Sequence, residues 1–108
     1  MNELALTEQN FAAEVDSAAT PMLVYFWGIS CGNCQVMGPI LEQIGQERAG
    51  AVKIAKIDAG EEMSLAARFN VRGLPTFLFL KGGQVKDTHV GAVSKAGLLK
   101  KLDAIIAS

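Results

Sequence analysis

Cys31 and Cys34 are the residues of this chain whose type and spacing most clearly suggest chemistry, and the chain has no other cysteine. A thiol attacks a disulfide as the thiolate, and an ordinary free cysteine is mostly protonated at neutral pH. The pair lies between a continuous apolar run, residues 22–27, and a segment from Gln35 with helical spacing of apolar residues. We therefore expect Cys31 where a strand gives way to a helix. There the unpaired backbone N–H groups and the helix dipole favour an ionised sulfur.

The three-residue spacing predicts a two-step thiol–disulfide exchange. Cys31 would attack a partner's disulfide and form a mixed disulfide, and Cys34, about one helical turn further on and more shielded, would then displace the partner. The spacing makes this second step intramolecular.

Two other interpretations of the pair stay open. A structural zinc site needs four nitrogen or sulfur ligands, and His89 is the single histidine that could join the two sulfurs. We expect His89 to be a solvated strand residue instead, and we predict no metal site. The thiols could also be inert and buried. A Cys-x-x-Cys pair that follows a buried strand and opens a helix favours redox chemistry over both interpretations.

Length and composition limit the class of protein. The 108 residues predict one domain, residues 1–108, and half of them are hydrophobic, which is enough for a core without structural disulfides or metals. The net charge of −1 with scattered charges argues against nucleic-acid binding, and no apolar run approaches the ~20 residues of a membrane helix. The first residues lack the pattern of a secretion signal. If Met1 is the native initiator, we expect a monomer in the reducing cytoplasm, where paired cysteines are more often reactive than structural.

Hydrophobic periodicity predicts strands that alternate with helices and then a final hairpin and helix, which indicates an α/β domain with a mixed sheet. Thr7 would cap the first helix, and Pro39 would kink the second. The expected strands are residues 22–27, 51–58, 76–80 and 85–90. The expected helices are residues 7–15, a segment from Gln35 through Ile44, residues 61–69, and a segment from Ser94 to Ile106.

Several segments together resemble the thioredoxin family, nearly from end to end. These segments are Phe26-Trp27, Cys31-Gly32-Asn33-Cys34, Gly38-Pro39-Ile40-Leu41, Val71-Arg72-Gly73-Leu74-Pro75-Thr76, Lys81-Gly82-Gly83 and Val90-Gly91-Ala92. The resemblance implies a thioredoxin fold, in which helices flank both faces of a central mixed sheet. It also implies a protein-disulfide reductase of electron transport and cell redox homeostasis, with no bound cofactor beyond a redox-active Cys31–Cys34 disulfide. Its partners would be disulfide-containing client proteins and thioredoxin reductase or a related reductase.

The resemblance further implies which residues face a client. Trp27, Ser30, Gly32 and Asn33 would form the active-site loop with the cysteines. Leu74, a cis Pro75, Thr76 and Gly91 would bind the substrate. The backbone of Leu74 would pair with an extended client chain, and Gly91 would leave room beside the sulfurs.

Ser30 and Asn33 depart from the family motif, which is Trp-Cys-Gly-Pro-Cys. The loss of an exposed aromatic residue at Ser30 removes contact area from the docking surface. Asn33 has a backbone N–H that proline lacks and that could point at the Cys31 sulfur. Stabilisation of the thiolate stabilises the reduced form, so we predict a protein less reducing than the ~−270 mV of a standard thioredoxin.

Tyr25 stands where the family usually carries a buried aspartate that accepts the proton of the resolving cysteine. Tyrosine, with an ordinary pKa of about 10, is a poor base at neutral pH. In one interpretation Tyr25 is a core aromatic residue whose hydroxyl bonds Lys56 or a water. In the other, Asp58 supplies the missing carboxylate, since Lys56 and Asp58 share one face of a strand. Parity alone does not bring Asp58 to Cys34, so we favour the first.

Two other functions are compatible with the same motif. One is a disulfide oxidant or isomerase, and the other is a thioredoxin-fold binding subunit with incidental cysteines. The intact cysteine pair and the Leu74-Pro75-Thr76 turn favour the reductase, because a binding subunit needs neither.

Overall fold

A five-stranded mixed sheet forms the centre of the molecule in the computed structural model, which describes residues 4–108. Its spatial order is β1-β3-β2-β4-β5. The strands are β1 (Leu4–Ala5), β2 (Met22–Trp27), β3 (Lys53–Asp58), β4 (Thr76–Lys81) and β5 (Gln84–Val90). The strand β3 runs parallel to β1 and β2, whereas β4 runs antiparallel to β2 and β5. The predicted α/β class and mixed sheet are confirmed.

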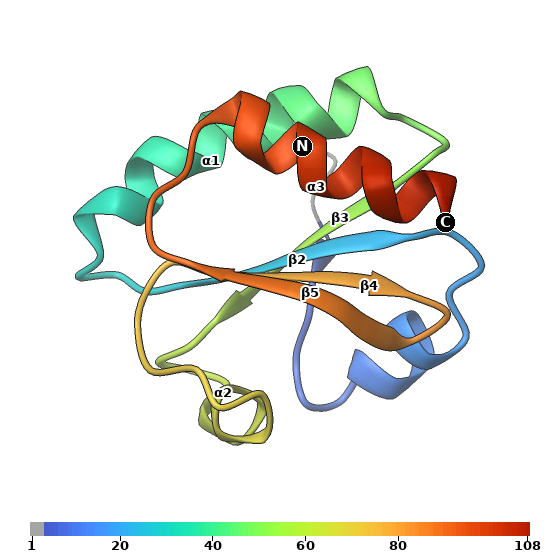
Figure 1. Cartoon of the computed structure of the whole chain (residues 1–108). Helices are drawn as coiled ribbons and strands as arrows, with labels where there is room; N and C mark the ends of the chain where they lie inside the picture. The colour runs from blue at the N-terminus through green and yellow to red at the C-terminus, as the bar shows by residue number, and fades with distance from the viewer. Residues whose placement is uncertain (1–3) are drawn as a thin grey trace.

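Helices cover both faces of this sheet (Figure 1). The long helices α1 (Gly32–Glu47) and α3 (Lys95–Ala107) pack on one face, and the short helices η1 (Ala12–Asp16) and α2 (Met63–Arg68) lie on the other. Alternate residues of β2 therefore join different cores. Leu23 and Tyr25 pack under α1 and α3, and Met22, Val24 and Phe26 pack on the opposite face. Burial on both faces explains why this strand reads as one apolar run.

The segment before β2 differs from its prediction. Thr7 does cap a turn, because its hydroxyl oxygen accepts the Asn10 backbone N–H at 3.3 Å while Asn10 Oδ1 accepts the Thr7 N–H at 2.8 Å. This reciprocal pair holds residues 7–10 in a turn, so the helix η1 is shorter than the expected one and begins at Ala12. The two-residue strand β1 was not predicted, since so short a segment carries no periodicity.

Element boundaries shift by a few residues elsewhere. The helix α1 begins at Gly32, directly after its N-cap residue Cys31, which confirms the expected position of Cys31 at the start of a helix. It therefore begins three residues before the apolar periodicity that starts at Gln35, and it continues past Pro39 to Glu47. The strand β3 begins at Lys53 rather than at residue 51, where the chain is still turning out of α1. The hairpin between β4 and β5 is confirmed, and its two turn glycines, Gly82 and Gly83, have φ angles of +62° and +78°.

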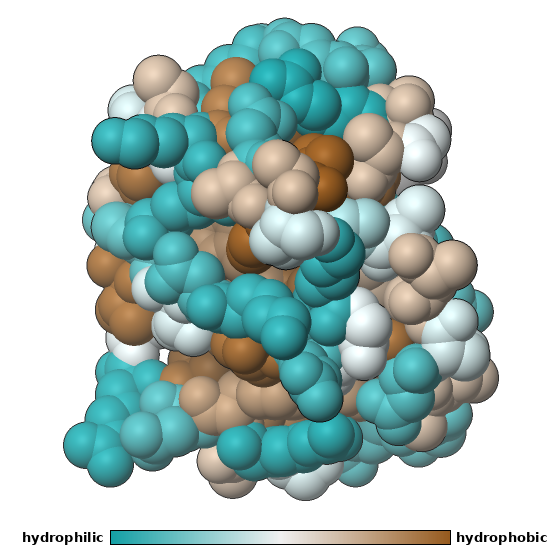
Figure 2. All heavy atoms as spheres, turned by 45° about the vertical axis from the view of Figure 1, so that its right-hand side comes forward, coloured by the Kyte–Doolittle hydropathy of each residue, from teal (hydrophilic) through white to brown (hydrophobic). Residues whose placement is uncertain are grey.

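The surface on the side of the C-terminus is mainly hydrophilic, with small hydrophobic areas between the polar side chains (Figure 2). None of the helices among residues 4–108 is both long enough and apolar enough to cross a membrane.

Candidate active site

The candidate site lies at one end of the central strands, where chain segments distant in sequence meet. Because β2 and β4 are antiparallel, the end of β2 lies beside the start of β4, with Phe26 paired to Thr76. The loop after β2 carries the cysteines, and the loop before β4 carries Pro75. The end of β5 joins them, since the Gly91 N–H donates to the Pro75 carbonyl at 2.8 Å.

Cys31 and Cys34 form a disulfide, with their Cα atoms 5.3 Å apart. Cys31 is half-buried, whereas Cys34 is 5% exposed. Cys31 is the N-cap residue of α1, and its Sγ accepts the backbone N–H of Cys34 at 3.2 Å. The sequence suggested the N–H of Asn33 as a candidate donor to this sulfur, but the donor in the structure is one residue further on. An N-cap side chain normally accepts from the second or third helical residue, and Cys34 is the third.

The turn before β4 holds the second side of the site. The Leu74–Pro75 peptide bond is cis, which is the geometry that the family resemblance implies. The buried hydroxyl of Thr76 donates to the Gly73 carbonyl at 2.6 Å and closes this turn. Gly91 has a φ of +97°, a left-handed conformation that glycine adopts without strain.

A groove of about 580 Å³ runs between the cysteine loop and this turn. Its walls are residues 28–33 on one side, and Gly60 and residues 72–74 on the other. It contains Cys31 together with the two motif departures, Ser30 and Asn33. Leu74 and Gly73 face the cysteine loop across it, so the structure brings Leu74, a predicted substrate-binding residue, together with the redox residues.

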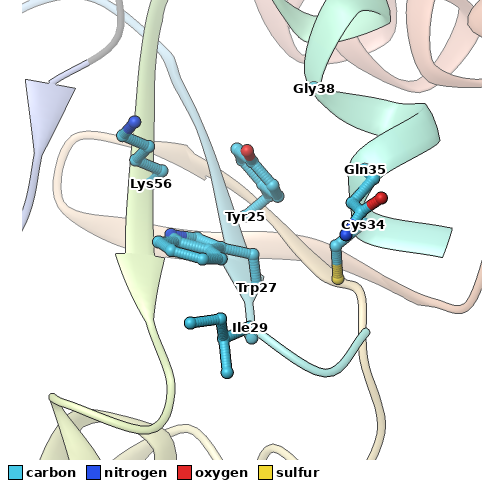
Figure 3. A pocket seen from close by; sticks show the side chains of 8 residues that line it. Tyr25, Trp27, Ile29, Cys34, Gln35, Gly38 and Lys56 are labelled. Atoms are coloured by element: carbon cyan, nitrogen blue, oxygen red, sulfur yellow. The ribbon is translucent and has the colours of Figure 1, made fainter. Parts of the chain in front are cut away.

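A second cavity, of about 290 Å³, lies at Cys34 and shares Gly28 and Ile29 with the groove. Tyr25, Trp27, Gln35 and Lys56 line it with Cys34. Figure 3 shows the Tyr25 ring between Lys56 on one side and Cys34 on the other, with the Tyr25 hydroxyl pointing away from the sulfur. Tyr25 is 6% exposed, and its ring stacks on Phe77 with centroids 6.1 Å apart. Tyr25 is therefore a core aromatic residue as well as a wall of this cavity.

Asp58 is engaged elsewhere. Its Oδ1 accepts the backbone N–H groups of Gly60 at 2.9 Å and Glu61 at 3.3 Å, so this carboxylate caps the turn after β3. Asp58 is paired in register with Trp27, but it is not among the residues that line the cavity behind Cys34. This placement supports the interpretation in which Asp58 does not exchange protons with Cys34.

His89 corrects another expectation. It is not a freely solvated strand residue, because it lies half-buried in β5 with its ring 6.3 Å from that of Phe77. Its Nε2 is buried and has no hydrogen-bond partner among the described residues. Across residues 4–108, no three His, Cys, Asp or Glu side chains converge in the way that a metal site requires.

Sequence reasoning did not single out two residues that shape the groove. Gly28 lies against Leu74, since a Cβ built at Gly28 would be 2.8 Å from Leu74 Cδ1. Ile29 is 87% exposed and lines both the groove and the cavity behind Cys34. The sequence shows a hydrophobic residue two positions before Cys31, but its exposure follows only from the fold.

Comparison with known proteins gives a consistent result. Residues 2–104 match the family model described as Thioredoxin. The chain is 40% identical over 97 residues to "Thioredoxin 2" of Chlorobaculum tepidum, which covers 90% of this chain and 89% of that protein. It is 38% identical over 99 residues to "Thioredoxin 1" of Synechococcus elongatus, which covers 92% of each. It is 39% identical over 92 residues to "Thioredoxin M-type, chloroplastic" of Pisum sativum, and the aligned segment covers 85% of this chain and 54% of that protein.

Proposed function

This chain belongs to the thioredoxin family, and from that premise we propose that Cys31 is the attacking thiol and Cys34 the resolving thiol of a protein-disulfide reductase. As a thiol–disulfide oxidoreductase of the thioredoxin type it carries a redox-active Cys31–Cys34 disulfide and no separate cofactor. The observation that carries the assignment of roles is the asymmetry of the two sulfurs. Cys31 borders an open groove and caps α1, whereas Cys34 is buried behind it.

The reaction begins with the reduced, dithiol protein. The Cys31 thiolate attacks one sulfur of a client disulfide, so that a Cys31–client bond forms, the client disulfide breaks, and the released client thiolate takes a proton from water. The Cys34 thiol then loses its proton and attacks the Cys31 sulfur. The Cys31–Cys34 bond forms, the mixed disulfide breaks, and the second client thiolate is protonated. The client gains two electrons and two protons, and the dithiol loses them.

The groove positions the client for this exchange. The Cys34 N–H that bonds Cys31 Sγ in the disulfide would donate to the thiolate more strongly, since hydrogen bonds to charged acceptors are roughly twice as strong. An extended client chain would lie between the cysteine loop and Leu74, and Pro75, Thr76 and Gly91 would support the turn that carries Leu74. Ser30, Gly32 and Asn33 line the opposite wall, and Trp27 supports that loop from the cavity behind Cys34.

Release of the client requires deprotonation of Cys34. We assign this step to water in the cavity behind Cys34, with Tyr25 as a packing residue and Lys56 as a nearby cation, and without a proton transfer to Asp58. What supports this is the cavity lining and the engagement of Asp58 with the turn after β3.

The proposed partners and setting follow from the reaction. Thioredoxin reductase or a related enzyme would return the disulfide to the dithiol, and disulfide-containing proteins would be the clients. A dithiol reductase works where thiols are kept reduced, so we assign it to the cytoplasm. We propose that residues 1–108 act as one domain and as a monomer.

A coupled assay tests the function. Reduction of a protein disulfide is measured with the protein, thioredoxin reductase and its nicotinamide cofactor, and again with dithiothreitol as the reductant. Activity in both supports the proposal, and activity with dithiothreitol alone indicates a different reductase. Inactivity in both, with accessible thiols, would support the binding-subunit alternative.

The roles of the two cysteines are tested by trapping. Cys34→Ser should accumulate a mixed disulfide with the client, because the second step is blocked, whereas Cys31→Ser should trap none. The opposite pattern would reverse the assignment. Net oxidation of reduced clients in a glutathione buffer would favour the oxidant alternative.

A further inference from the structure

Ile29 is the large hydrophobic residue with the greatest exposure in the described chain, at 87%. A β-branched aliphatic side chain so exposed adds nothing to the core, and its burial in a complex would favour binding. Ile29 lies two residues before Cys31 and lines the client groove. Ile29 therefore adds exposed apolar surface to the groove that contains Cys31.

The lining of the groove includes an apolar strip to which Ile29 belongs. Gly28 has no side chain, and for this reason Leu74 can lie against the cysteine loop, within the space that a Cβ at Gly28 would need. The strip consists of the Ile29 side chain, the Gly28 backbone and the Leu74 methyl groups. Arg72 is the single charged residue among the lining residues, and its Nε donates to Asn70 Oδ1.

We infer that Ile29 is a specificity-determining residue that selects client chains with an apolar side chain within two residues of their disulfide-bonded cysteine. The inference rests on the proposed function and names its substrate class. Ser30 stands where an aromatic residue would supply contact area, and Ile29 supplies that contact one position earlier on the same loop. A polar client side chain at this place would lose its hydration against the strip without gaining a hydrogen bond.

The experiment compares two peptide disulfides that differ at one position. Each is a symmetric dimer of one short peptide, with either Leu or Asn directly before the cysteine, because these side chains have similar size. The reduced protein is mixed with excess peptide, and the reaction is followed through the fluorescence of Trp27, the single tryptophan of the chain. The dependence of the observed rate on peptide concentration gives the second-order rate constant. The quantity of interest is the ratio of the Leu rate to the Asn rate, in which general effects on the cysteines cancel.

We expect the wild-type ratio to be about five- to tenfold and the Ile29→Ser ratio to fall to about one, because the discriminating apolar contact is lost. Ile29→Val should keep most of the preference. Met63→Ser is the matched control, since Met63 is 72% exposed but lines neither the groove nor the cavity, and it should retain the wild-type ratio.

Each outcome is decisive. A wild-type protein without a preference, or an Ile29→Ser variant that keeps it, overturns the inference while leaving the proposed function intact. Equal loss of the preference in Met63→Ser also overturns it. Failure of the reduced wild-type protein to react with either peptide, and with a small disulfide such as hydroxyethyl disulfide, contradicts the proposed function itself.

Discussion

Cys31 joins two roles that different residues usually fill. It caps α1 by accepting the N–H of Cys34, a position where serine, threonine, asparagine or aspartate is usual, and it carries the reacting sulfur. The start of the helix and the state of the sulfur are thereby coupled, because a thiolate is a better acceptor than a disulfide sulfur.

Asn33 supplies a backbone N–H at the start of α1 that can be tested by substitution. It is the second residue of α1, so its N–H is one of the unpaired donors at the helix start, and proline would remove it. We expect Asn33→Pro to lower the redox potential by about 20 mV, which corresponds to about 1 kcal/mol for a two-electron couple. Equilibration with glutathione buffers measures the change. Asn33→Ala, which keeps the N–H, is the control, and an equal shift in both variants would contradict the explanation.

The charge of Asp58 can be removed without the loss of its two hydrogen bonds. Asp58→Asn preserves an oxygen that can accept the N–H groups of Gly60 and Glu61 but removes the charge. We expect the pH dependence of client release to be unchanged, because Asp58 does not line the cavity behind Cys34. The release rate is measured from a preformed mixed disulfide across the neutral range. A shifted profile would mean that Asp58 is the missing carboxylate after all.

Among the elements, β5 and α3 are joined by an ion pair between Asp87 and Lys101 at 2.9 Å. The hydrogen bond from Lys101 lowers the pKa of Asp87 from its ordinary value of 3.8, and the Thr88 N–H adds to this effect. A carboxylate with a lowered pKa stabilises the fold above its ordinary value, and that stability is lost as the pH falls through the lowered pKa.

We therefore expect Lys101→Met to lower the free energy of unfolding at pH 7 by about 0.5 kcal/mol, a small value because Asp87 is 41% exposed and solvent screens the pair. The difference from wild type should shrink as the pH falls through the lowered pKa of Asp87 and Asp87 becomes protonated. Urea unfolding at pH 7 and at a series of acid pH values measures it. Lys100→Met, at the exposed neighbouring lysine, controls for the loss of one positive charge, and a difference that persists at acid pH would refute the mechanism.

Most elements were predictable because their apolar residues recur with a clear period, as in β2 and α3. The predictions failed where short-range hydrogen bonds decide the structure. Thr7 and Asn10 bond to each other and shorten the first helix. The expected position of Cys31 at the start of a helix is confirmed, since it is the N-cap residue of α1.

Across the whole molecule, the turn between β4 and β5 packs on η1 near the other end of the chain. A Cβ built at Gly83 would lie 3.3 Å from the Cα of Asp16, whereas one built at Gly82 would meet nothing within 4 Å. Both glycines have positive φ, so alanine costs roughly 1–2 kcal/mol at either position.

Gly83→Ala should therefore destabilise the protein by about 1 kcal/mol more than Gly82→Ala, because it also crowds the η1 backbone. Chemical unfolding of the two variants gives the comparison. Equal losses would show that the contact between the hairpin turn and η1 yields without cost.

The chemistry of the site was more predictable than its shape. The cysteine spacing suggested the exchange reaction, and the family resemblance suggested the residues around Pro75. The contact between Gly28 and Leu74 depends on how the loops after β2 and before β4 meet, and no local pattern encodes such a meeting. Ile29 illustrates the limit, since an exposed hydrophobic residue can be recognised only once the surface is known.

The pairing of β2 with β4 has a consequence for a chain that is still being synthesised. Both thiols leave the ribosome well before Leu74 and Pro75, so for that interval the nascent polypeptide has both cysteines but lacks the wall that would bind a client. The active site is therefore complete only after β4 and β5 have joined the sheet, and a truncated translation product would keep the thiols without the client-binding wall.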